Sequence, residues 1–219
     1  PNIAVNILGE TIGTVAVPFF FMMSAYWLFR FDVYDRSAMN ILVGKIKKKV
    51  KTICLPYLLW NTFGMIFYMV ITRIPFAANM MNHGTAILIT LSNVMEGIFL
   101  HKYYFTFWYM QDLIGLIAIS PIILIILKSK YTTLITIIAT AIAVLFKIDF
   151  TLFNGTSFLF FMIGAYMVAH ANNYFESESN KAHGYFGAFV LAGIIRYVNI
   201  PIMAELSYFI SPILLWKSM

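Results

Sequence analysis

The chain has 219 residues, of which 61% are hydrophobic and 11% are charged, and its formal net charge is +6. A soluble domain averages about 25% charged residues, so this chain cannot cover itself with a water-compatible surface, and soluble classes such as nucleic-acid-binding proteins are excluded. The composition predicts an all-α integral membrane protein, a polytopic bundle of transmembrane helices that forms a single domain over residues 1–219. The single cysteine, Cys54, excludes a disulfide framework.

The first predicted membrane span covers residues 11–30. Residues 1–10 lack the charged region and the cleavage site of a signal peptide, and this abrupt opening leads us to expect that a longer protein begins before Pro1. Pro18 is expected to kink the span. Ser24 lies in its cytoplasmic third, where a serine most often bonds its own helix backbone.

A lysine-dense run then leads directly into the apolar segment ICLPYLLW; it comprises Lys45, Lys47, Lys48, Lys49 and Lys51. Around it, Leu42, Ile46, Val50 and Ile53 recur at about helical spacing. This pattern predicts an amphipathic helix that lies at the cytoplasmic interface before it turns into the bilayer. Two roles for the lysines stay open: orientation with attraction to anionic lipid, or a phosphate-binding patch for an anionic cosubstrate.

Six further spans follow, and none of the apolar runs alternates as a β-strand would. Residues 85–100 are too short and too polar for a span, so we expect a re-entrant or surface-lying helix there. A full crossing at 85–100 would reverse the orientation of everything downstream. The six predicted spans are 53–72, 105–127, 132–147, 157–171, 184–200 and 203–217.

The loop charges predict the orientation. Alternate connections, beginning with residues 30–52, carry most of the 15 basic residues. Because cytoplasmic loops are enriched in lysine and arginine, the 30–52 loop is predicted to be cytoplasmic. The chain is thus expected to be a multi-pass protein of the cytoplasmic membrane.

Acidic residues at membrane depth are the next candidates for function, since each is costly unless it is paired or faces a cavity. Asp112 lies within the span 105–127, directly after Trp108, Tyr109 and Gln111. Glu205 lies near the start of the last span, and Glu10 lies just before the first. A hydrogen bond between packed helices is the simpler role for Asp112.

The four histidines do not point to a metal site or to a general base. His83 and His101 are predicted on the outer side, and His170 and His183 flank an acidic cytoplasmic loop. No two of them have metal-ligand spacing on one helical turn, so we expect no bound metal.

Four segments together resemble the acyltransferase-3 family of bacterial integral membrane acyltransferases. Each motif alone is weak in an apolar chain, but their order and spacing match the family pattern. The segments are VPFFFMMSAYWLF (17–29), KIKKKVKTICLPYLLW (45–60), FTFWYMQDLIGLIAISPII (105–123) and SFLFFMIGAYMV (157–168).

The resemblance implies an O-acyltransferase that moves an acyl group, often acetyl, from cytoplasmic acyl-CoA to a carbohydrate or other cell-envelope acceptor at the outer face. Acyl-CoA would be a cosubstrate, and no cofactor would stay bound. Lys45, Lys48, Lys49 and Lys51 would meet the phosphates of acyl-CoA. The path and the pockets through the membrane would be lined by Ser24, Tyr26, Trp108, Tyr109 and Asp112.

The chain departs from the family pattern in two respects. Ala25 stands where the family usually has glycine, which questions a close backbone approach there. The family's first helix, with its key basic residue and its histidine, is expected before Pro1, and its last helices are expected after Met219. The catalytic residues therefore stay unnamed.

A transporter or exporter of a polar or lipid-linked solute is the alternative function. Asp112 and Glu205 would then serve as intramembrane polar sites, and the lysines would only orient the protein. Internal symmetry and paired discontinuous helices would favour a transporter, and the sequence displays neither.

Overall fold

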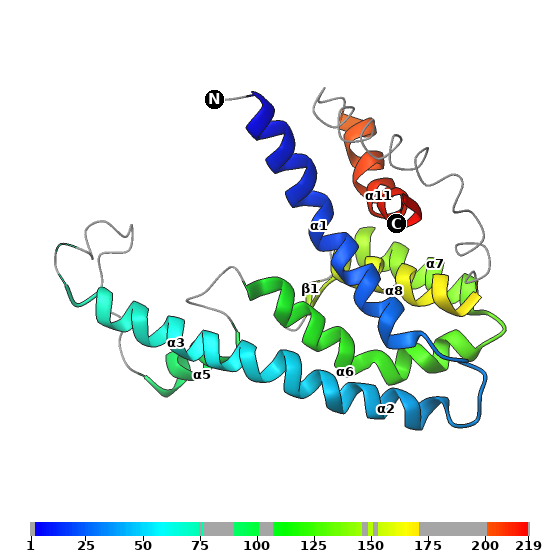
Figure 1. Ribbon diagram of the computed structural model, residues 1–219, viewed down its shortest axis with the longest axis horizontal. Helices are drawn as coiled ribbons and strands as arrows, with labels where there is room; N and C mark the ends of the chain where they lie inside the picture. The colour runs from blue at the N-terminus through cyan, green and yellow to red at the C-terminus, as the bar shows by residue number, and fades with distance from the viewer. Residues whose placement is uncertain are drawn as a thin grey trace. The chain divides into compact units, whose positions relative to one another are not determined.

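The computed structural model in Figure 1 confirms the predicted helical class. It describes residues 3–74, 76, 90–100, 107–145, 149–150, 153–170 and 201–218. The helices are α1 (Ile3–Phe29), α2 (Ala38–Lys49), the π-helix η1 (Val50–Cys54), α3 (Leu55–Ile71), α5 (Leu91–Phe99), α6 (Trp108–Lys128), α7 (Thr132–Leu145), α8 (Gly155–His170) and α11 (Pro201–Ser218).

A small antiparallel ribbon precedes α8, where the sequence indicated no strand. Its strands are β1 (Asp149–Phe150) and β2 (Phe153–Asn154), with Asp149 opposite Asn154 and Phe150 opposite Phe153. Two residues per strand are too few for a visible alternation of polar and apolar residues. The ribbon has a local role, because the Asn154 carboxamide accepts a hydrogen bond from the Ser157 N–H (2.8 Å) at the start of α8.

The chain divides into two compact units. Unit 1 consists of Pro1–Leu42 and Ser120–Met219, and unit 2 consists of Val43–Ile119. In unit 1, α8 packs against both α1 and α7, and α1 also packs against α11. In unit 2, α3 packs against α5.

The core of unit 1 depends on a close approach between α1 and α8 (Figure 1). A Cβ atom built on Gly164 in α8 would lie 2.8 Å from the Met22 Cα of α1, which is closer than real Cβ contacts. Edge-to-face rings extend this contact, with the Phe29 and Phe161 centroids 6.3 Å apart. Ala25 is fully buried in α1. The close approach exists despite that alanine, because α8 supplies the glycine.

The predicted turn between the basic helix and the membrane span is wrong. Helices α2, η1 and α3 form one continuous helix of 34 residues, Ala38–Ile71. The π-helical turn Val50–Cys54 lies within this helix. Leu42 is buried, whereas Val50 at the start of the turn is 49% exposed. The Thr52 hydroxyl donates to the Lys48 carbonyl (3.2 Å) beside that turn.

Two described helices are long and apolar enough to cross a membrane, Ala38–Ile71 and Trp108–Lys128. They include most of the predicted spans 53–72 and 105–127. Shorter apolar helices cover Val15–Phe29 and Gly155–His170. The predicted span 184–200 lies outside the described residues, and the total of seven crossings stays a prediction.

Helix α5 occupies part of the segment expected to be re-entrant or surface-lying. Its nine residues would extend roughly 14 Å, about half of a 30 Å hydrocarbon core. Thr90 caps its start by accepting a hydrogen bond from the Asn93 N–H (3.3 Å). Length alone therefore excludes a crossing by α5.

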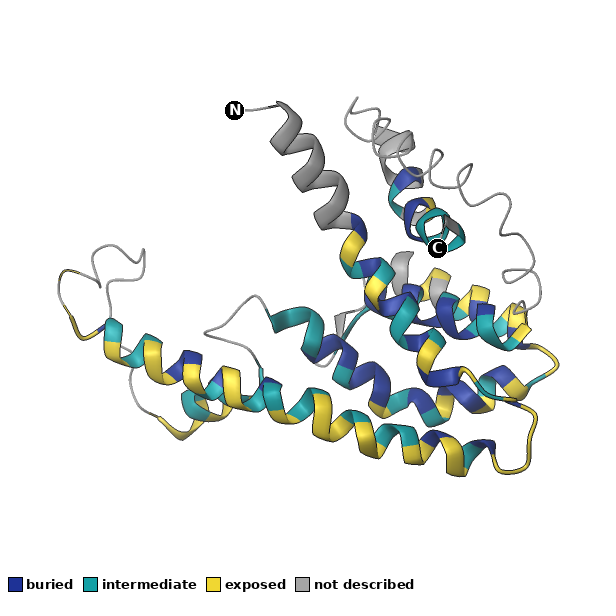
Figure 2. Cartoon of the chain, in the orientation of Figure 1, coloured by how far each residue is buried: buried dark blue, intermediate teal, exposed yellow. Residues whose placement is uncertain are grey.

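Helix α3 exposes one side and buries the other (Figure 2). Its exposed side is apolar, and its buried side is partly polar. Leu59 and Phe63 are 62% and 59% exposed, whereas Tyr57 and Asn61 are buried. A helix of a soluble protein would have the reverse arrangement. This arrangement suits a helix whose outer face contacts lipid.

Candidate functional site

The burial pattern of the helix Ala38–Ile71 divides the four predicted phosphate-binding lysines into two pairs. Lys45 and Lys49 are half-buried, whereas Lys48 and Lys51 are exposed, as is their neighbour Lys47. Further along the helix, the buried stripe continues through Tyr57 and Asn61 in α3. The less exposed polar side chains of this helix in unit 2 thus lie along one side of it. Two lysines stand at its basic end, and Tyr57 and Asn61 follow in its apolar part.

Tyr57 is a junction of three helices in unit 2. Its hydroxyl lies 2.9 Å from the Phe99 carbonyl at the end of α5 and 3.1 Å from the Gln111 carboxamide at the start of α6. Because a phenol has one proton, it donates to one of these partners, and a turned Gln111 amide donates to the phenol in the other bond. Both side chains are buried. The phenol therefore satisfies Gln111 and joins the three helices.

We expect the substitution Tyr57→Phe to lower the free energy of unfolding by about 1 kcal/mol, since it removes the shared hydroxyl and leaves buried polar groups without it. Thermal unfolding in detergent measures this. The Tyr131 side chain is exposed, so Tyr131→Phe is the matched control and should leave the unfolding temperature unchanged. Equal stability of both variants would contradict the junction.

Asn61 is the neighbouring polar residue on the stripe, one turn beyond Tyr57. Its side chain is 1% exposed, and neither its nitrogen nor its oxygen has a hydrogen-bond partner among the residues that the structure describes. Burying an amide without a partner costs roughly 2–7 kcal/mol. A buried, unpartnered polar side chain in an apolar helix makes Asn61 a candidate ligand-binding position.

The residues predicted at the start of α6 also belong to unit 2. Trp108 and Tyr109 are half-buried, with ring centroids 6.5 Å apart in an edge-to-face arrangement. Asp112 is 7% exposed. The structure thus places Asp112 and Gln111 side by side on the buried part of one helix, close to Tyr57 through Gln111.

Ser24 and Tyr26 belong to unit 1, and both are half-buried in α1. The Tyr26 ring packs edge-to-face against Trp216 of α11, with centroids 4.8 Å apart. The Arg30 guanidinium lies over the same Tyr26 ring, 5.5 Å from its centroid. These contacts hold the end of α1 against α11. Their role as lining of a path stays a prediction.

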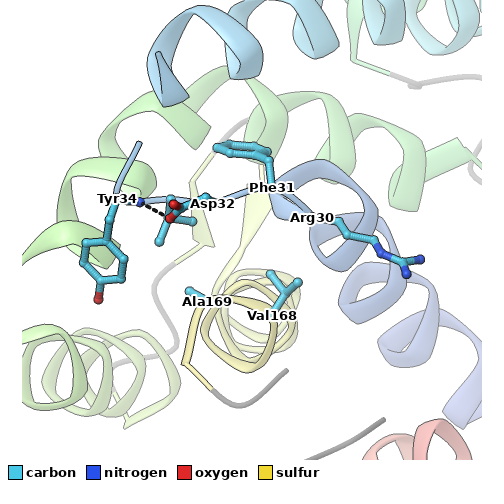
Figure 3. Close-up of a pocket in the computed structure, with 7 residues that line it drawn as sticks. Arg30, Phe31, Asp32, Tyr34, Val168 and Ala169 are labelled. Atoms are coloured by element: carbon cyan, nitrogen blue, oxygen red, sulfur yellow. Dashed lines mark hydrogen bonds between the residues drawn. The ribbon is translucent and has the colours of Figure 1, made fainter. Parts of the chain in front are cut away.

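A second polar region of unit 1, which the sequence reasoning missed, surrounds the loop after α1 (Figure 3). The loop and the end of α8 enclose a pocket of about 320 Å³. Asp32 accepts a hydrogen bond from the Tyr34 N–H (2.9 Å), and the Tyr34 hydroxyl lies 3.5 Å from Nδ1 of His170. The pocket is lined by Arg30, Phe31, Asp32, Val33, Tyr34, Val168 and Ala169.

The same loop is tied to the end of α6. The Lys128 ammonium donates to the Asp35 carbonyl (3.2 Å). The Ser37 hydroxyl and backbone N–H both donate to the Asp35 carboxylate (2.7 and 2.5 Å), and these bonds, with the nearby Lys128 charge, lower the pKa of Asp35. The loop after α1 therefore lies beside the ends of α6 and α8.

Several predicted positions have no described side chain. Glu10 and Glu205 lie in α1 and α11, but their side chains are outside the described set. His83, His101 and His183 also fall outside the described residues. Among the side chains that are described, no group of three His, Cys, Asp or Glu could hold a metal ion.

A family model described as an acyltransferase domain matches residues 1–218. No curated protein and no solved structure matches the chain.

Proposed function

This chain belongs to the acyltransferase-3 family, and from this membership we propose that it transfers an acetyl group from cytoplasmic acetyl-CoA to a hydroxyl of a carbohydrate or other cell-envelope acceptor on the outer face of the membrane. In the reaction the acetyl C–S bond breaks and a C–O bond to the acceptor forms. The proton of the acceptor hydroxyl ends on the thiol of free coenzyme A.

The observation that carries this proposal is the continuous helix Ala38–Ile71. Its basic end has two half-buried lysines, Lys45 and Lys49, which can bind phosphates as point charges. Its apolar end is long enough to enter the bilayer. One continuous helix therefore carries both the lysines for the phosphates of acetyl-CoA and the buried polar side chains Tyr57 and Asn61. Acetyl-CoA needs both, because its phosphates are charged and its long pantetheine arm is not.

The same proposal assigns Lys48 and Lys51 to the electrostatic field that attracts acyl-CoA, since both are exposed. Trp108, Tyr109 and Asp112 would shape the acyl or acceptor pocket, and Ser24 and Tyr26 would line the path. The contact between Lys128 and the loop after α1 supports a common, cytoplasmic side for the basic connections.

The test uses the protein purified in nanodiscs with acetyl-CoA labelled in the acetyl group. We expect release of the coenzyme A thiol that depends on the protein and increases when envelope carbohydrate is added, with label appearing on that carbohydrate. Absence of both acetyl-CoA binding and thiol release would contradict the proposal. Uptake or export of a polar solute lost on Asp112→Asn would then favour the transporter.

A further inference from the structure

Asn61 offers a ligand two kinds of hydrogen-bonding group side by side. Its carboxamide has an oxygen that accepts and an NH2 group that donates, and the described residues satisfy neither. Tyr57, one turn away on the same helix, already forms a hydrogen bond with Gln111 of α6. A fitting ligand therefore needs an acceptor and a donor that face the same side, as the C=O of one secondary amide and the N–H of a second, neighbouring amide can.

We propose that Asn61 binds the pantetheine arm of the acyl donor by pairing with the amide nearest to the thioester. The proposal rests on the proposed function. The arm contains two secondary amides between the diphosphate and the sulfur, and each presents a C=O and an N–H. The C=O and the N–H of one trans amide point to opposite sides. The Asn61 carboxamide can therefore donate to the C=O of the amide nearest to the thioester and accept from the N–H of the other amide, whereas a lysine can only donate.

The spacing along the helix agrees with this assignment. From Lys49 to Asn61 the helix rises roughly 18 Å at 1.5 Å per residue. The arm from the diphosphate to the sulfur has the length of about four extended peptide units, or roughly 14 Å. The lysine side chain spans the remainder. A phosphate at Lys49 would thus place the thioester end of the arm at the level of Asn61.

The two faces of α3 explain why the arm would follow this line. The outer face carries exposed apolar side chains such as Phe63 and Phe67, which suit lipid and offer an amide no partner. The inner face carries Tyr57 and Asn61. An arm with two amides is stabilised only along the inner, polar face.

The experiment compares two ligands on one variant. Coenzyme A contains the arm, whereas adenosine 3′,5′-bisphosphate contains phosphates without it. We expect Asn61→Leu to weaken binding of coenzyme A about tenfold, the effect of losing a buried hydrogen-bonded pair, and to leave the affinity for the bisphosphate unchanged. Equal changes for both ligands, or no change for coenzyme A, would overturn the proposal.

Control variants separate this effect from misfolding. The Thr62 hydroxyl next to Asn61 donates to the Leu58 carbonyl of its own helix (2.7 Å), so Thr62→Val should bind coenzyme A as the unchanged protein does. Leucine removes an unsatisfied buried amide, so Asn61→Leu should unfold at or above the original temperature. If Asn61→Leu does not fold, Asn61→Ala gives the same comparison of ligands.

The remaining outcomes distinguish the inference from the proposed function. If the unchanged protein binds neither ligand, the proposed function fails. If it binds coenzyme A and Asn61→Leu binds it equally well, only the inference fails. If Asn61→Leu keeps its affinity for coenzyme A but loses acetyl transfer to carbohydrate, Asn61 binds the acceptor hydroxyl, and the inference is wrong.

Discussion

Replacing Lys45 and Lys49 together by glutamine should weaken the binding of coenzyme A on the order of 100-fold. Both side chains are half-buried, so solvent screens their attraction to phosphate less than that of an exposed lysine. A hydrogen bond to a charged group contributes about 1.5–3 kcal/mol, and losing two such bonds at the lower end of that range gives this magnitude. Isothermal calorimetry in nanodiscs measures the affinity, and glutamine retains most of the side-chain length.

The matched control removes the same charge at two exposed positions. Lys47 and Lys130 are both exposed, and Lys47→Gln combined with Lys130→Gln should weaken binding only a few-fold, through the general field. If both double variants bind equally weakly, net charge rather than contact explains the effect. If neither changes the affinity while the orientation of the protein is retained, the lysines act only on topology and lipid.

Replacing Gly164 by alanine should destabilise unit 1 by about 3 kcal/mol, at the upper end of overpacking effects. The new methyl group would lie 2.8 Å from the Met22 Cα, and backbone atoms of a packed helix cannot move aside as a flexible side chain can. Helices α1 and α8 must separate, and the packing of Phe29 against Phe161 is lost with them. Thermal unfolding in detergent would report this as a lower midpoint.

Gly44 in α2 supplies the contrast. A Cβ atom there would meet nothing within 4 Å. Gly44→Ala should therefore raise the free energy of unfolding by roughly 0.5–1 kcal/mol, because alanine loses less conformational entropy in a helix interior. If Gly164→Ala is as stable as Gly44→Ala, α1 and α8 do not approach as closely as the structure places them.

The basic segment shows how well the spacing of apolar residues predicts burial. The spacing of Leu42, Ile46, Val50 and Ile53 predicted one apolar face, and Leu42 is indeed buried. Val50, however, is exposed, and the wider turn of η1 begins there, at Val50–Cys54. A period of 3.6 residues cannot anticipate that wider turn, since the local residues are compatible with both turns.

The sequence by itself determined the helical membrane class, the resemblance to the acyltransferase-3 family and the location of most helices. The length and composition of an apolar segment are local properties of the chain. A long apolar segment favours a membrane environment whichever helices it packs against. The order of the four family motifs is likewise a property of the sequence and does not depend on contacts between segments.

Only the tertiary structure decided that the half-buried Lys45 and Lys49 lie on one stripe with the buried Asn61, and that Asn61 lacks a described partner. It also decided that α8 supplies the glycine for a close approach to α1. These features depend on which segments, distant in the sequence, pack together. A short stretch of sequence does not indicate which segments contact it in the fold. The physical reason is that burial and hydrogen-bond satisfaction belong to contacts between helices, whereas helix formation belongs to the chain locally.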